Sequence, residues 1–205
     1  MLFMTITQTT KSSPGRPRSI EVHQAILQAT LDLLAEFGYQ GLSIEAIAAR
    51  AGVGKATIYR RYNSKEELIA EAIECNRPQL TIPDTGSLWT DLEEVHKQAA
   101  ELDLSPLGRQ TIAMIISLAS TIPQFAEIYW KKYVIPRRKA ASIIFKRAKA
   151  RGEMSPDVDP DLICDLMTGL LFKSILFQPE TEEIKSYMRR ALDFLLQGVT
   201  SKPSQ

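Results

Sequence analysis

Apolar side chains recur along this chain with the spacing of helices rather than of strands. Stripes that begin at Val22, Ile44, Leu68 and Ile112 repeat every three or four residues, which places their members on one face of an α-helix. Strict alternation of apolar and polar residues, which is typical of a half-buried strand, is not evident. The sequence therefore predicts an all-α protein, with helices at residues 19–37, 44–51, 55–62, 65–76, 88–102, 105–122, 125–151, 160–177 and 184–196.

Residues that favour the ends of helices separate these stripes. Gly38 follows the last apolar position of the first helix and is expected to end it, and Gly52 suits a left-handed cap at the end of the second, where a Cβ would be penalised. Gly54 is expected to leave room for a close approach of backbone. Ser64 and Glu67 form a capping box, at the N-cap and the third position of the next helix. Cap residues and periodicity thus agree on where the helices begin and end.

The stretch from Ser43 to Tyr62 predicts two short helices joined by a tight turn, with Ser43 as the cap of the first. In the second helix Ile58 is the natural anchor into a core, and most of its neighbours are cations, hydrogen-bond donors or aromatic residues. Such side chains contact phosphates and base edges, and the second helix of a helix-turn-helix lies in the major groove of DNA. The alternative is a helical hairpin with a solvated basic face. The candidates for contacts in the groove are Lys55, Thr57, Tyr59 and Arg60, and those for contacts with phosphates are Ser43, Tyr62 and Lys65.

The net charge of +1 does not by itself favour nucleic acid, but the charge distribution does. Between Lys11 and Lys65 the cations outnumber the carboxylates, which suits a basic DNA-binding part on a nearly neutral body. Residues 1–18 have too few apolar side chains to fold alone and are expected to form a flexible arm. Arg16 and Arg18 in this arm are candidates for the minor groove, with a solvated tail as the alternative.

One long predicted helix, at residues 125–151, contains a proline. Pro136 removes a backbone hydrogen bond and is expected to kink the helix near Lys132–Tyr133. The cations on its outside are interpreted as a solvated helix face rather than as a second nucleic-acid site. They are Arg137, Arg138, Lys139, Lys146, Arg147 and Lys149.

The last two predicted helices have more apolar surface than a chain of this size can easily cover. Residues 162–177 are apolar nearly all round, and a stripe runs along residues 184–195. A four-helix bundle made by these helices and their copies in a two-fold dimer would bury both surfaces. An internal core pair is the alternative. A dimer would present two DNA-binding helices about 34–36 Å or a little more apart, which predicts a palindromic operator.

No catalytic constellation, cofactor motif or metal-ligand spacing is evident in the sequence. Cys75 and Cys164 lie far apart and are expected to be reduced thiols. No apolar run approaches the roughly 20 residues of a membrane-spanning helix, and residues 1–10 do not form a convincing signal peptide. We therefore expect a cytoplasmic protein that is not an enzyme, acts without a cofactor and has no membrane partner.

The segment around the predicted turn resembles the DNA-binding signature of the TetR family of bacterial transcription regulators. The matching residues are Ile47, Ala48, Ala51, Gly52, Val53, Ile58, Tyr59, Tyr62, Lys65 and Leu68. The resemblance implies an arm at residues 1–18, a helix-turn-helix domain at residues 19–63, and a helical ligand-binding and dimerisation domain at residues 64–205. It further implies a homodimer formed through the last two helices, and a repressor that a small-molecule effector releases from its operator.

The same resemblance implies a ligand cavity in the C-terminal helical domain. The sequence does not name the effector that binds there. We expect an aromatic or lipophilic effector, although aromatic residues at helical spacing are more often plain core. The candidate lining residues are Trp89, His96, Met114, Phe125, Tyr129, Trp130, Tyr133 and Phe172. Two other classes of function remain open: a protein-interaction module, and an enzyme with a site in the C-terminal bundle.

Overall fold

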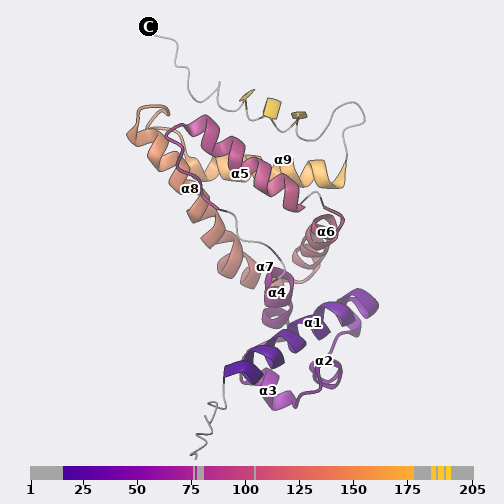
Figure 1. Cartoon of the computed structure of the whole chain (residues 1–205). Helices are drawn as coiled ribbons and strands as arrows, with labels where there is room; N and C mark the ends of the chain where they lie inside the picture. Colours follow the sequence, from indigo (N-terminus) through magenta and orange to yellow (C-terminus); the bar gives the residue numbers. More distant parts are fainter. Residues whose placement is uncertain are drawn as a thin grey trace, which may run out of the picture. The chain divides into compact units, whose positions relative to one another are not determined.

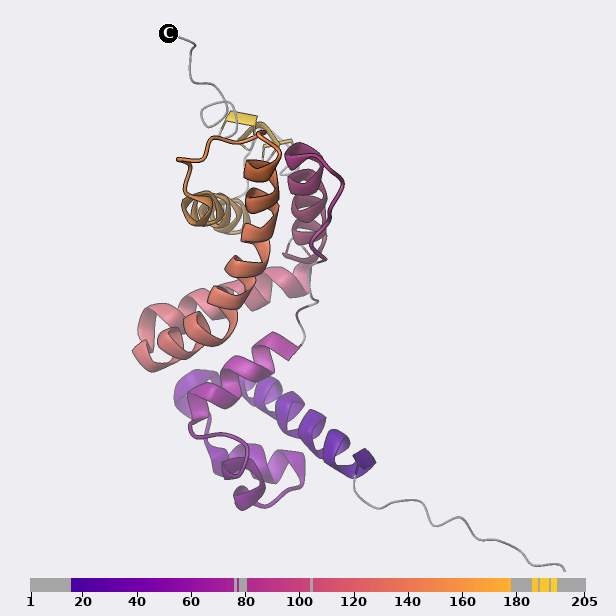
Figure 2. The same ribbon diagram turned by 90° about the vertical axis from the view of Figure 1, so that its left-hand side faces the viewer.

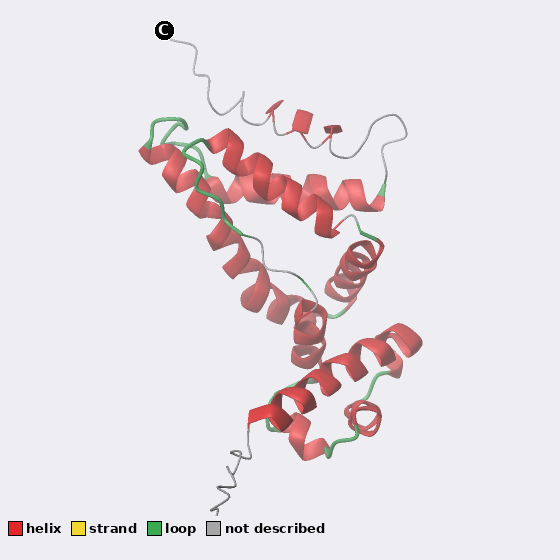
Figure 3. Ribbon diagram, in the orientation of Figure 1, coloured by secondary structure: helices red, strands yellow, loops and turns green. Residues whose placement is uncertain are grey.

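The computed structural model describes residues 16–75, 77, 81–103, 105–177, 186–187, 189–191 and 193–194. Throughout these residues the regular structure is helical and no strand occurs, as predicted (Figure 3). The chain separates into two compact units, Met1–Ala72 and Ile73–Gln205. Among the described residues no helix combines the length and apolar character that crossing a membrane requires.

The first unit contains α1 (Arg16–Gly41), α2 (Ile44–Ala51), α3 (Lys55–Tyr59) and most of α4 (Lys65–Cys75), and α1 packs against α2 (Figure 1). Helix α1 begins at Arg16 rather than at Ser19, so the last residues of the predicted arm lie in its first turn. Gly38, where the helix was predicted to end, has a non-helical φ of 65° and ψ of −177°. Beyond Gly38 the chain is helical again up to Gly41.

The core of the first unit takes one apolar face from each helix. Ile26 on α1, Ile47 on α2 and Ile58 on α3 are all 0% exposed, and Leu68 and Ile69 on α4 are equally buried. A helix as short as α3 is not stable alone, because the first turn costs more conformational entropy than its hydrogen bond returns. Burial of Ile58 therefore holds α3 in place, which confirms the predicted anchor.

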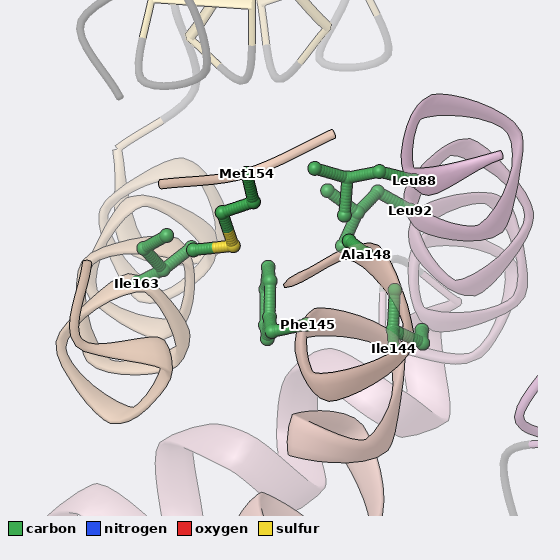
Figure 4. Packing of buried hydrophobic residues seen from close by; sticks show 7 residues of the cluster. All are labelled: Leu88, Leu92, Ile144, Phe145, Ala148, Met154 and Ile163. Atoms are coloured by element: carbon green, nitrogen blue, oxygen red, sulfur yellow. The ribbon is translucent and has the colours of Figure 1, made fainter. Parts of the chain in front are cut away.

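The second unit contains α5 (Leu88–Asp103), α6 (Pro106–Thr121), α7 (Pro123–Tyr129), the π-helical turn η1 (Trp130–Val134), α8 (Ile135–Ala150) and α9 (Pro160–Leu176). Helix α8 contacts both α5 and α9, and Figure 2 shows it running beside α5. A cluster of buried side chains from these three helices and the α8–α9 loop fills the space between them (Figure 4). Its members are Leu88, Leu92, Ile144, Phe145, Ala148, Met154 and Ile163.

Two proline-started helices in this unit begin where the sequence predicts. The Ser105 hydroxyl accepts the Gly108 N–H at 3.0 Å, and the Asp159 carboxylate accepts the Asp161 N–H at 2.8 Å. In both cases proline occupies the first helical position, where its missing N–H costs nothing. These caps fix the starts of α6 and α9.

Pro136 interrupts the long helix where predicted, but the interruption is a π-turn rather than a plain kink. Ile135 donates its backbone N–H to the carbonyl of Trp130, five residues back. Proline cannot donate to the carbonyl four residues before it and would collide with that carbonyl in a regular α-helix. The wider turn at Trp130–Val134 accommodates the ring and lets the helix continue as α8.

Most of the stripe predicted for the last helix, residues 184–196, lies outside the described residues. Phe194, which is described, is 78% exposed. The predicted pairing of this helix with its copy therefore stays a prediction.

Candidate nucleic-acid interface

The turn between α2 and α3 is built as the sequence predicts. The Ser43 hydroxyl accepts the Ala46 N–H at 3.1 Å and caps α2. At the other end Gly52 has φ 67°, and its N–H turns back to the carbonyl of Ala49. Val53 donates to the carbonyl of Ala48 at 3.0 Å, which closes the helix end. The two short helices are thus joined in a defined geometry.

The outer side of α3 carries the side chains predicted for the major groove. Tyr59 is 58% exposed, Lys55 and Arg60 are exposed, and Thr57 is half-buried. Ile58 points the other way into the core. With Ile58 buried, the helical spacing turns Lys55, Tyr59 and Arg60 to the outside. This surface therefore presents an ammonium, a phenol and a guanidinium to a partner. Their contacts with DNA stay predictions.

Carboxylates in the first unit hold two of its cations. Lys55 Nζ lies 3.1 Å from a carboxylate oxygen of Glu45 on α2. Arg50 makes two parallel 2.9 Å hydrogen bonds to Glu36 on α1. Glu45's own backbone N–H and then Lys55 hold the pKa of Glu45 below its usual range. A phosphate or base edge that binds Lys55 must therefore compete with Glu45.

Two of the predicted phosphate contacts have other partners within the unit. Tyr62 is only 3% exposed, and its hydroxyl lies 3.4 Å from His23 Nδ1. Lys65 donates to the carbonyls of Tyr39 at 3.2 Å and Leu42 at 3.0 Å, with its ammonium 3.9 Å from the centre of the Tyr39 ring. Both side chains thus pack and cap the fold, and this argues against a purely DNA-facing role for either.

Tyr39, which the sequence analysis did not single out, is central to this packing. Its hydroxyl donates to the carboxylate of Glu66 at 2.5 Å, and Glu66 is itself buried. The hydrogen bond with Glu66, with some burial, raises the pKa of Tyr39 to about 12. The pairing joins the end of α1 to the start of α4. Because 27 residues separate the partners, no local sequence signal could have shown it.

The capping box before α4 is present with a shifted partner. The Glu67 N–H donates to the Ser64 hydroxyl at 3.1 Å, as predicted. The Glu67 carboxylate accepts the backbone N–H of Asn63 at 3.0 Å and also its side-chain amide. The side chains of Arg16 and Arg18 lie outside the described residues, so their place in the minor groove stays a prediction.

In the second unit the predicted effector residues do not form one group. Phe125, Tyr129 and Tyr133 make a row, with ring centres 5.4 Å apart at each step. Trp89 instead packs against the cluster around Phe145. Trp130 is 45% exposed. Met114 and Phe172 are half-buried, and the side chain of His96 lies outside the described residues.

The three arginines of α8 are paired with carboxylates within the unit, which corrects the expectation of a solvated face for them, whereas Lys139 and Lys146 are exposed as expected. Arg138 lies 2.9 Å from Asp165 on α9, and Arg147 lies 3.5 Å from Asp84. Arg137 pairs with Glu74. These pairs neutralise half of the six cations on the helix, which weakens the case for a second nucleic-acid site.

Comparison with known proteins identifies the family. The model described as "Bacterial regulatory proteins, tetR family" matches residues 26–72, and the model described as "Tetracyclin repressor-like, C-terminal domain" matches residues 82–195. The HTH-type transcriptional regulator YdeS of Bacillus subtilis is 32% identical over 190 residues, which are 92% of this chain and 95% of that protein. The chain belongs to the TetR family of bacterial regulatory proteins.

Other relatives of this TetR family protein agree with the assignment. The HTH-type transcriptional regulator Mb1581 of Mycobacterium bovis is 36% identical over 179 residues, 85% of each chain. The crystal structure of the TetR family transcription regulator SCO0332 is 28% identical, with a TM-score of 0.64 over 89% of this chain and 100% of that one. This TetR family member is thus a DNA-binding transcriptional regulator, and its helix-turn-helix lies within the first matched segment.

Proposed function

We propose that this TetR family regulator is a homodimeric repressor that binds a palindromic operator and is released by a small-molecule effector. The observation that carries the proposal is the surface of α3. Lys55 and Tyr59 on α3 and Arg60 at its C-terminal cap are exposed, and the buried Ile58 fixes the position of this helix. A recognition helix needs this combination of a rigid anchor and outward hydrogen-bonding groups.

The apolar face of α9 supports the dimer. Leu162 is 56% exposed, Leu166 44% and Leu176 48%. With the exposed Gly169 they follow a spacing of four, three and seven residues, the seam along which two helices pack. An added Cβ at Gly169 would meet no atom within 4 Å, so the seam is open there for a close helix. A second copy of the chain is the proposed occupant.

Effector binding belongs to the second unit in this proposal. The effector is expected to favour the form of the dimer that has low affinity for the operator. Because the two equilibria are linked, effector and operator each lower the affinity of the protein for the other by the same factor. The row of Phe125, Tyr129 and Tyr133 supports an aromatic or lipophilic ligand, because it gathers ring surface from one helical segment. The other predicted lining residues stay predictions.

Selection from a randomised duplex pool at near-physiological salt, followed by sequencing, tests the proposal. We expect an enriched palindrome with half-sites about one helical turn, 34–36 Å, or more apart. Arg60→Ala should lose discrimination at one or two base pairs by about 1–3 kcal/mol per pair. Retention that depends on salt but enriches no sequence would contradict the proposal and favour the protein-interaction alternative.

A further inference from the structure

Two donors from α7 and α8 meet on one carboxylate in the second unit. The hydroxyl of Tyr129 donates to Oε2 of Glu74 at 2.9 Å, and the guanidinium of Arg137 donates to Oε1 of the same residue. Glu74 belongs to the last turn of α4, 55 and 63 residues away in sequence. The Glu74 side chain is 17% exposed and that of Arg137 35%, so the three groups meet at a partly desolvated place.

The π-turn brings the two donors to the same side of their helix. Eight residues of uninterrupted α-helix would leave Tyr129 and Arg137 about 80° apart around the axis. A single π-turn absorbs one extra residue, so the pair behaves as if seven residues apart, which leaves only about 20°. The turn at Trp130–Val134 lies between them. Pro136, which favours this turn, therefore also sets the geometry of the donor pair.

The surroundings favour an anion with an apolar body. The charges of Arg77 and Arg137 both act on the Tyr129 hydroxyl, against the single carboxylate of Glu74. Burial and then the charge of Glu74 raise the pKa of Tyr129 above its usual range, so the phenol keeps its proton and remains a donor at neutral pH. The ring of Tyr129 stacks on that of Phe125, which is 0% exposed, so apolar surface adjoins the donor pair.

We infer that Tyr129 and Arg137 form a carboxylate-binding clamp which Glu74 occupies in the free protein, and that the effector carries a carboxylate which takes the place of Glu74. The inference rests on the proposed effector-controlled function and names the chemical class of the effector: an organic acid with an aromatic or lipophilic body. Displacement frees the end of α4, the helix that continues from the second unit into the first.

Emptying the clamp gives a direct test on the full-length protein. In Glu74→Ala we expect 3-phenylpropionate to bind at least about ten-fold more tightly than its neutral isostere 3-phenylpropionamide, because hydrogen bonds to a charged partner exceed those to a neutral one by this order. Wild type should bind the acid more weakly than the variant, since Glu74 competes. Glu74→Gln keeps the size of the side chain, and its affinity for the acid should lie between those of the wild type and Glu74→Ala. This variant secures the test if the alanine variant folds poorly.

Neighbouring arginines supply the matched control. Combining Glu74→Ala with Arg137→Gln should reduce the preference for acid over amide to about two-fold or less, by loss of the charged donor. Combining it with Arg138→Gln should leave the preference intact, because Arg138 pairs with Asp165 instead. Equal binding of acid and amide to Glu74→Ala, or a preference that survives Arg137→Gln, would overturn the inference.

The operator supplies the second arm. If the wild-type protein binds its selected operator, the acid should weaken that complex and the amide should not, and Arg137→Gln should abolish the difference. A wild-type protein that binds no operator would refute the proposed function while leaving the binding measurements on Glu74→Ala valid. An operator complex indifferent to the acid would refute the effector role of the clamp.

Discussion

Two glycines flank Val53 at the turn of the helix-turn-helix, and their backbones differ in what they require. Gly52 has φ +67°, a conformation that L-residues rarely adopt. Gly54 has an ordinary φ of −76°, and an added Cβ there would meet nothing within 4 Å. The expectation that Gly54 leaves room for a close backbone approach is therefore wrong. Only Gly52 is required by the turn.

Gly52→Ala should destabilise the protein by about 1–2 kcal/mol, the cost of a left-handed conformation with a Cβ. Gly54→Ala is the matched control and should change the free energy of unfolding by no more than a few tenths of a kcal/mol, the usual result at an unstrained surface position. Thermal or urea unfolding of the two variants measures the difference. Equal losses would show that the turn does not depend on the αL cap.

Lys65 has a structural task that its place beside the recognition helix does not reveal. Lys65→Ala removes the ammonium that donates to the carbonyls of Tyr39 and Leu42 and lies over the Tyr39 ring, and leaves the Tyr39 carbonyl only the backbone N–H of Leu42 at 3.4 Å. We expect a loss of about 1–2 kcal/mol in unfolding free energy. Lys65→Arg should recover part of it.

Salt dependence separates this role from the predicted phosphate contact. If Lys65 also touches a phosphate, the slope of log binding constant against log salt should flatten by about one unit in Lys65→Ala. An unchanged slope together with lower stability would assign Lys65 to the fold alone.

At the scale of single elements, the sequence was most informative where the controlling interaction is local. The caps at Ser43, Ser105 and Asp159 bond to residues two or three positions away, so they could be predicted. The pairing of Tyr39 with Glu66 and the meeting of Tyr129 with Glu74 join distant segments. Their partners are set by tertiary packing, which residue spacing does not encode.

Helix α5 shows the same contrast, because its first turn is satisfied from the α8–α9 loop. The backbone N–H of Leu88 donates to Glu153 at 2.6 Å, and Arg151 holds the other carboxylate oxygen. Arg151 first, and then the Leu88 N–H, hold the pKa of Glu153 below its usual range. A carboxylate whose pKa is lowered by folding stabilises the protein above its unfolded pKa, and this contribution is lost as the pH falls through the folded value.

Glu153→Gln should therefore lower the unfolding temperature by a few degrees at pH 7. The difference in unfolding temperature between variant and wild type should become smaller once the pH falls below the ordinary glutamate pKa of about 4.3. Scanning calorimetry from pH 7 to pH 3 measures both effects. Glu127→Gln is the control: its i,i+4 pair with Lys131 is 66% exposed and should matter little. A difference in unfolding temperature that stays constant with pH would contradict the stabilising role of the Glu153 carboxylate.

For the whole molecule, the exposed apolar positions of α9 have their largest consequence for assembly. An aspartate at Leu166 would place a charge in the proposed seam between two copies. Leu166→Asp should halve the mass seen by light scattering and reduce operator affinity, because a monomer holds only one recognition helix. Leu107→Asp, at a leucine 64% exposed on α6, is the matched control and should leave the mass unchanged.

The π-turn at Trp130–Val134 also says how this protein and its relatives can diverge. It holds one residue more than a regular helix needs, so a relative with one residue fewer there would run as continuous α-helix and still keep its donor pair about 20° apart. A relative of the same length without the π-turn would instead have everything beyond it rotated by about 100° relative to Tyr129, and Arg137 would leave its side of the helix although neither residue had been substituted. The winding of this short segment, together with its length, would therefore sort related regulators by the chemistry of the molecules they detect.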